Sequence, residues 1–150
     1  MRIKTLNPTP FRMCSKWLLS VEMKVDHYTQ TSKTSPKNAN IIFVRAIGSS
    51  HGSRIPSVWL NNLGHIWIEH RNNKVGFHFK HFDRPESSFK LTLSELNGRF
   101  KIEKDGVKMY EKAQMVPTNF DNVEAQIYLL SPYHAKPSGW YKNFQLWTQC

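Results

Sequence analysis

The sequence predicts an all-β protein, an antiparallel sandwich or barrel with roughly ten short strands. Three observations favour this class. Apolar residues recur at every second position in several segments, which is the period of a half-buried strand. Turn-forming residues separate these segments at short intervals, and no segment has the period of a helix. With 150 residues, 39% hydrophobic and 13% aromatic, the chain can build one core and is too apolar for disorder.

The first third of the chain predicts an arm, a strand, a loop and a buried strand. Residues 1–13 contain prolines and no period, so we expect an irregular arm before a single domain at 14–150. Apart from Leu18, residues 17–25 alternate apolar and polar side chains, which predicts a half-buried strand. The polar segment 29–40 predicts a loop, and the β-branched run 41–47 predicts an inner strand.

The middle third predicts a series of hairpins. A strand beginning near Pro56 is turned back by residues 61–64, and the return strand 65–70 follows. Further strands are expected at 75–79, 88–93 and 98–104, and the last two at 123–129 and 140–147. Asp105-Gly106 is a strong hairpin signal, because glycine tolerates the positive φ that a two-residue turn requires.

The chain is strongly basic, with a net charge of +10 from 21 Lys and Arg against 11 Asp and Glu. This charge indicates either a solvated basic surface or attraction to polyanions such as sulfated glycans, anionic lipid or nucleic acid. The basic residues are scattered, so nucleic acid is the less expected partner. No apolar run reaches the roughly 18 residues of a membrane helix. The sequence leaves the oligomeric state open.

Cys14 and Cys150 are the only cysteines of the chain. A disulfide between them is geometrically reasonable if the first and last strands are neighbours, and it would stabilise the fold by about 4–5 kcal/mol. Two free thiols in a reducing compartment are the alternative. Residues 1–8 lack the apolar stretch of a signal peptide, so a mature domain, an excised module and an intracellular protein all stay open.

The order of motifs resembles that of a known class of module. The motifs are the strand Trp-Leu-Leu-Ser-Val-Glu-Met-Lys at 17–24, Gly-Ser-Arg-Ile-Pro-Ser-Val-Trp-Leu-Asn at 52–61, Lys-Asp-Gly-Val at 104–107, Phe-Asp-Asn-Val at 120–123, and an ending with Ser-Pro-Tyr, Lys-Pro-Ser-Gly-Trp and Lys-Asn-Phe. Over about residues 14–148 this order is similar to the concanavalin A-like, laminin G-like jelly-roll modules of invertebrate, especially cnidarian, extracellular proteins.

The resemblance implies a two-sheet jelly roll with adjacent terminal strands, at a cell surface or outside the cell. It also implies a binding or adhesive role toward glycans or proteins, sometimes with calcium. The family often has an aspartate where this chain has Ser131, and this departure weakens the case for calcium. Oxygen ligands for calcium are available at 119, 121 and 122 and at Asp83 with Glu86, although turn formation is the more ordinary role.

The acidic and histidine residues predict neither an active site nor a metal site. Glycan hydrolysis requires two nearby carboxylates. The spacings Glu22/Asp26 and Glu103/Asp105, and lone acids such as Glu95, are instead typical of solvated side chains. His65/His70 and His78/His81 have opposite parity on a strand and do not converge on a zinc ion. No nucleophile elbow or phosphate loop is present, so we expect a non-enzymatic protein, with a diverged glycan hydrolase as an alternative.

The aromatic residues favour a binding function. Trp67 is out of phase with the apolar Ile66 and Ile68, and it shares its parity with His65 and Glu69. Trp59, Trp140 and Trp147 are expected in the core. The candidate ligand-binding residues, which include basic groups for an anionic glycan, are Arg54, His65, Trp67, Glu69, Arg71, Tyr133 and His134. A module for protein–protein adhesion or a structural role is the other alternative.

Overall fold

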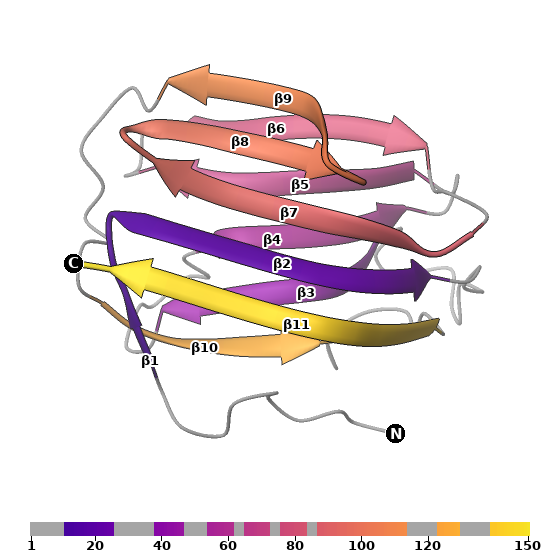
Figure 1. The fold of residues 1–150 in the computed structure, drawn as a ribbon, viewed down its shortest axis with the longest axis horizontal. Coiled ribbons are helices and arrows are strands. Elements are labelled where there is room, and N and C mark those ends of the chain that lie inside the picture. Colours follow the sequence, from indigo (N-terminus) through magenta and orange to yellow (C-terminus); the bar gives the residue numbers. More distant parts are fainter. Residues whose placement is uncertain are drawn as a thin grey trace.

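In a computed structural model the chain forms two antiparallel β-sheets that pack face to face (Figure 1). The structure describes residues 11–25, 38–46, 54–61, 65–72, 76–83, 87–113, 123–129 and 139–150, with side chains in part of these ranges. Within them, no helix is long and apolar enough to cross a membrane. The predicted all-β sandwich is therefore confirmed.

Within the described ranges, six strands build one sheet and five build the other. The six-stranded sheet has the order β1-β10-β3-β4-β5-β6, and the five-stranded sheet, which lies in front in Figure 1, has the order β11-β2-β7-β8-β9. The strands are β1 (Phe11–Met13), β2 (Lys16–Val25), β3 (Asn38–Ala46), β4 (Arg54–Asn61), β5 (His65–Asn72), β6 (Gly76–Asp83), β7 (Phe89–Leu96), β8 (Arg99–Lys104), β9 (Val107–Ala113), β10 (Val123–Leu129) and β11 (Gly139–Gln149).

The core lies between the sheets and follows the predicted alternation. On β2 every second side chain is buried, and the intervening ones face outward. The core includes Trp17, Leu19, Val21, Met23, Val25, Ile41, Ile42, Val44, Val58, Leu60, Ile66, Ile68, Leu91, Leu93, Phe100, Ile102, Ala125 and Ile127. β3, predicted as an inner strand, lies between β10 and β4. Burial of one face of each strand therefore sets which residues remain for the two outer faces.

Three details differ from the sequence-based expectation. Residues 38–40, at the end of the expected loop 29–40, already belong to β3. Residues Phe11–Met13, inside the expected arm at 1–13, pair with β10 as a short edge strand. Gly98, expected as the first residue of the strand 98–104, instead forms a second two-residue turn with Asn97, and their φ angles are 70° and 52°. Its geometry matches that of the predicted Asp105-Gly106 turn, whose φ angles are 51° and 78°. Two tight turns thus hold β7, β8 and β9 as a meander.

Candidate functional site

The outer face of the six-stranded sheet carries a stacked pair of tryptophans. Val58 on β4 pairs with Ile68 on β5, and both side chains are buried in the core. The next pair, Trp59 and Trp67, therefore faces away from the core. Their rings stack with centroids 5.3 Å apart and planes 12° apart. Trp59 is only 6% exposed, whereas Trp67 is half-buried. Trp67 is thus the accessible member of a rigid aromatic pair.

Polar side chains occupy the same outer face. Ser57 lies two residues before Trp59 and is fully buried, and His65 lies two residues before Trp67 and is half-buried. On β10, Gln126 and Tyr128 alternate with core residues, and the Tyr128 hydroxyl donates a 2.8 Å hydrogen bond to Oε1 of Gln126. This face therefore combines indole rings with hydroxyl, amide and imidazole groups, which suit sugar hydroxyls.

Several predicted binding residues belong to the same sheet by backbone register. Glu69 pairs with Ser57, Arg71 pairs with Phe77, and Arg54 pairs with Arg45. The structure describes the backbone of these three predicted residues and not their side chains. The closing-loop candidates Tyr133 and His134 lie outside the described residues, as do the possible calcium ligands at 119, 121 and 122.

Some members of this face were not predicted from the sequence. Gln126 and Tyr128 alternate with Ala125 and Ile127, so the strand period alone could have identified them. Trp59 was expected in the core. It is buried, but on the outer face beside Trp67, because it alternates with the core residues Val58 and Leu60.

The two tryptophans of β11 correct another expectation. Trp140 and Trp147 were predicted to be core residues, but their exposed fractions are 43% and 47%. They have opposite parity, so a regular strand would expose only one of them. The register of β11 against β2 shifts between Lys142 and Gln145, and Asn143 has a φ of 53°. This β-bulge inserts one residue and directs both tryptophans to the outer face of the five-stranded sheet.

The acids are also arranged differently from the predicted pattern. Glu95 was expected to be solvated, yet it is 2% exposed, and its Oε2 accepts a 3.1 Å hydrogen bond from the Trp17 indole. Glu95 on β7 pairs with Trp17 on β2, so both side chains face the core. Within the described residues, no three His, Cys, Asp or Glu side chains are grouped to hold a metal ion.

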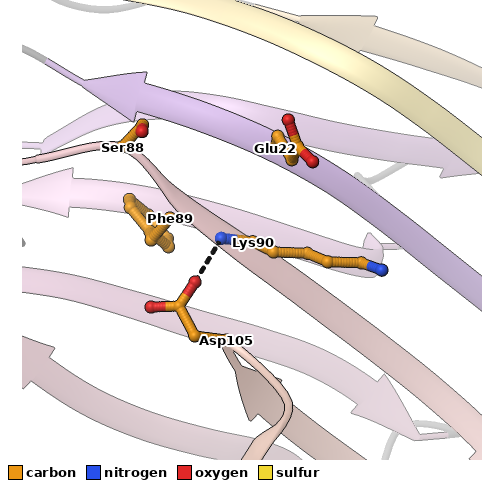
Figure 2. Close-up of a pocket in the computed structure, with 5 residues that line it drawn as sticks. All are labelled: Glu22, Ser88, Phe89, Lys90 and Asp105. Carbon is orange, nitrogen blue, oxygen red and sulfur yellow. Dashed lines mark hydrogen bonds between the residues drawn. The ribbon is translucent and has the colours of Figure 1, made fainter.

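A pocket of about 280 Å³ opens on the five-stranded sheet (Figure 2). It is lined by Glu22, Ser88, Phe89, Lys90 and Asp105. Asp105 closes one side, because its backbone N–H donates to the Lys90 carbonyl and its Oδ1 accepts from the Lys90 N–H, both at 2.8 Å. Glu22 and Asp105 both line this pocket, and they are not one of the carboxylate pairs considered from spacing. Asp105 has the turn role expected for it, and its carboxylate anchors the β8–β9 hairpin to β7.

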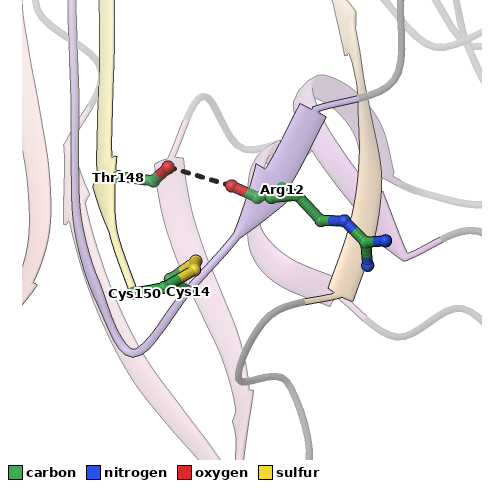
Figure 3. The surroundings of a disulfide bond; sticks show 4 residues. All are labelled: Arg12, Cys14, Thr148 and Cys150. Atoms are coloured by element: carbon green, nitrogen blue, oxygen red, sulfur yellow. Dashed lines mark hydrogen bonds between the residues drawn. A yellow bond between two sulfur atoms is a disulfide. The ribbon is translucent and has the colours of Figure 1, made fainter.

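Cys14 and Cys150 form a disulfide in the structure (Figure 3). Cys14 follows β1 of the six-stranded sheet, and Cys150 follows β11 of the five-stranded sheet. Close by, the Thr148 hydroxyl donates a 2.9 Å hydrogen bond to the Arg12 carbonyl. The covalent bond therefore joins the two sheets at one end of the sandwich. Such a bond indicates an oxidising setting.

Comparisons with known proteins identify solved structures that have a similar fold. No protein-family model matches it, and no curated protein matches it in sequence. The alginate lyase AlyC3, also solved with dimannuronate, has a TM-score of 0.65 and 13% identity over 91% of this chain and 66% of that chain. The family 7 alginate lyase AlyA1 from Zobellia galactanivorans has a TM-score of 0.62 and 12% identity over 95% of this chain and 66% of its own.

A third match is the binding domain of botulinum neurotoxin DC in complex with SialylT. Its TM-score is 0.62, with 11% identity over 88% of this chain and 32% of that chain. The chain spans just under two thirds of the length of the two lyases. At these identities the likeness concerns the fold: the chain shares the concanavalin A-like jelly roll of these proteins.

Proposed function

We propose that the chain is a non-enzymatic carbohydrate-binding module whose ligand lies on the outer face of the six-stranded sheet. The observation that carries this proposal is the stacked pair of Trp59 and half-buried Trp67 among polar groups. A sugar ring stacks its C–H face on indole, while its hydroxyls bond to neighbouring polar side chains. His65 and the bonded pair Gln126 and Tyr128 are the described side chains that offer such bonds.

An anionic glycan at a cell surface fits this proposal best. The net charge of +10 attracts polyanions, and Arg54 and Arg71 belong to the strands that carry the tryptophan pair. Two proteins with the same fold were solved with oligosaccharides, dimannuronate in one case and SialylT in the other. The disulfide between Cys14 and Cys150 supports the extracellular setting of the resembling laminin G-like modules.

A glycan array and a heparin column test the proposal with the wild-type chain and Trp67→Ala. We expect retention of the wild type above physiological salt and a loss of at least about fivefold in affinity for the variant. Trp67→Phe keeps an aromatic ring and should bind in between. Val107→Ala is a matched control, since Val107 is 64% exposed and lies on β9 of the other sheet.

Absence of glycan retention would contradict this function. A concentration-dependent dimer in sedimentation, together with no glycan signal, would instead support the adhesion or structural module.

A diverged polysaccharide-degrading enzyme is the second candidate. It is favoured by the alginate lyases among the solved structures with this fold. Incubation with alginate and with neutral glycans, followed by assays for new reducing ends and for unsaturated products, distinguishes it from the binding module. We expect no product. Turnover that is lost in a variant of the outer-face residues would replace the binding proposal with an enzymatic one.

A further inference from the structure

We infer that the outer face of the five-stranded sheet is a second binding surface, which takes an extended acidic polysaccharide along β11. This surface is on the opposite side of the sandwich from the proposed site and does not depend on it. We call it the β11 strip. It comprises Trp140, Lys142, Gln145 and Trp147 on β11 and their paired residues Lys24, Glu22, Ser20 and Leu18 on β2.

The two tryptophans define the length of the strip. Both are close to half exposed, and both face outward because of the bulge at Asn143. Seven residues of strand, less one for the bulge, separate them by roughly 20 Å. In the part of the chain that the structure describes, the only other exposed large hydrophobic residue is Val107. The exposed aromatic surface of this sheet is therefore concentrated at two points of one edge strand.

A polar floor lies between the two rings. Gln145, which is exposed, pairs with Ser20, and Ser20 pairs with Thr92. The hydroxyl oxygens of Ser20 and Thr92 are 3.3 Å apart, at hydrogen-bond distance. Ser94 continues the polar floor beside Leu18, and Ser20 and Ser94 are only 3% and 2% exposed. Two stacking platforms with the exposed Gln145 amide between them match a chain of sugar rings, whose faces are apolar and whose rims carry hydroxyls.

Positive charge surrounds the strip. Lys24 pairs with Trp140, and Glu22 lies between Lys142 and Lys90 in the register of three strands. Lys16 adds a fourth lysine at the far end, so four lysines face one glutamate on these strands. At the opposite end of the sheet, on β8 and β9, several cations contact acidic side chains.

The ion pairs on β8 and β9 have short distances between their nitrogen and oxygen atoms. Arg99 and Lys108 both contact Glu111, at 2.7 and 3.0 Å, and Lys101 lies 3.4 Å from Glu103. β8, β9 and the turn between them carry five cations against three acids, whereas β2, β11 and the start of β7 carry four lysines against Glu22. Both ends of the sheet therefore attract an acidic polymer, and among the described residues the strip is the one that also presents two exposed tryptophans to it.

The same observations argue against other partners with negative charge. A membrane surface requires a continuous apolar face, but the strip has Ser20, Thr92 and Gln145 between its two rings. Nucleic acid offers rings and phosphates, but the disulfide at the end of β11 indicates an oxidising setting. Acidic polysaccharide is the polymer that combines carboxylates, hydroxyls and apolar ring faces in that setting.

Binding of immobilised hyaluronan and alginate, with neutral dextran as reference, tests the strip. We expect Trp140→Ala and Trp147→Ala to weaken binding of either acidic polymer by at least about fivefold each. The double variant should lose more, and only polymers long enough to reach both tryptophans should show the full loss. Both residues are exposed, so thermal unfolding of the variants should match that of the wild type.

Lysine variants separate charge from stacking. Lys142→Gln should weaken binding and make it less dependent on salt, since screening acts on the lost charge. Lys101→Gln is the matched control, because Lys101 is already paired with Glu103. Val107→Ala is the control for an exposed apolar side chain. Both controls should bind like the wild type.

Three results would overturn the inference. The double tryptophan variant could bind acidic polymers as the wild type does, dextran could bind equally well, or the double variant could lose only binding to anionic vesicles. Trp67→Ala distinguishes the two faces. If it alone abolishes binding, the strip is not a site. If the strip variants alone abolish binding, the strip inference stands and the proposed function of the six-stranded face fails.

Discussion

Tyr141 on β11 donates a 2.6 Å hydrogen bond from its hydroxyl to the backbone carbonyl of Ile41 on β3, which belongs to the other sheet. Tyr141 pairs with Met23, so its ring faces the core before its hydroxyl reaches the opposite layer. Ile41 lies where the register of β3 against β4 shifts. A bulge in one sheet thus presents a carbonyl to the edge strand of the other, and this bond holds β11 against the sandwich.

Removal of this hydroxyl should destabilise the fold. Tyr141→Phe keeps the ring and leaves the Ile41 carbonyl without this donor, so we expect a loss of about 1–1.5 kcal/mol in the free energy of unfolding. Urea denaturation measures the loss. Tyr128→Phe is the matched control, because its hydroxyl bonds to Gln126 on an outer face and should matter less. Equal stabilities of Tyr141→Phe and the wild type would contradict this role.

The same tyrosine predicts a loss of stability in alkali. Burial raises the pKa of Tyr141 well above its ordinary value of about 10. The unfolded chain therefore releases this proton at lower pH than the folded chain. The contribution is complete below about pH 10 and declines above it, because ionisation then favours the unfolded state. Urea midpoints measured from about pH 8 to 11 should fall less for Tyr141→Phe than for the wild type. Parallel declines would contradict the prediction.

Reduction of the disulfide should lower stability strongly. Cys14 and Cys150 are 136 residues apart, so the bond closes nearly the whole chain. Loop entropy of the unfolded state alone would give about 5 kcal/mol as an upper figure. The double variant Cys14→Ser, Cys150→Ser should unfold at lower urea than the oxidised wild type, and reductant should leave the variant unchanged. Non-reducing peptide mapping that finds both thiols free would remove the basis of this prediction.

The two-residue alternation of apolar and polar side chains predicted the fold, because this alternation depends only on which face of each strand is buried. Residues 17–25 alternate with Leu18 as the one exception, and Trp17, Leu19, Val21, Met23 and Val25 all face the core. The same argument failed at Trp140 and Trp147, because it assumes a regular strand. Asn143 takes a positive φ and adds one residue, so Tyr141 and Phe144 both pack inward although their parities differ. A single asparagine in a sequence is not enough to predict such a bulge.

The candidate site was predictable in part for the same reason. Parity identified Trp67 as an outward residue beside Ile66 and Ile68, and the structure agrees. Its stacking on Trp59 depends on the register between β4 and β5, which is set by pairing of two strands and not by either strand alone. The hydrogen bond between Tyr128 and Gln126 joins two residues of one strand. The alternation along β10 therefore suffices to place both side chains on the same face.

Glu111 should titrate at unusually low pH. Hydrogen bonds from Arg99 and then from Lys108 lower the pKa of its carboxyl from the usual 4.5 to about 2. Its stabilising effect is therefore present above the usual pKa and is lost as pH falls toward 2. An NMR titration of the side-chain carboxyl measures the midpoint, and Arg99→Gln should raise it. Because the group is near the surface, added salt should also raise it. A wild-type midpoint near 4.5 at low salt would contradict the model of two donors.

The positive φ at Asn143 links the stability of β11 to the geometry of the strip. Asparagine tolerates a φ of 53°, glycine tolerates it better, and a β-branched residue strongly resists it. We therefore expect Asn143→Gly to keep both the fold and acidic-polymer binding. Asn143→Val should lower the free energy of unfolding by about 1–3 kcal/mol.

The consequence for binding follows from the register. If Asn143→Val removes the bulge, regular alternation would bring Phe144 outward and Trp147 inward. One stacking platform of the strip would then be lost. Iodide quenching of tryptophan fluorescence should decrease, and hyaluronan binding should fall as it does for Trp147→Ala. If the valine variant is less stable yet binds and quenches as the wild type does, the bulge survives the substitution, and the orientation of Trp147 must be set by its own packing beside Leu18.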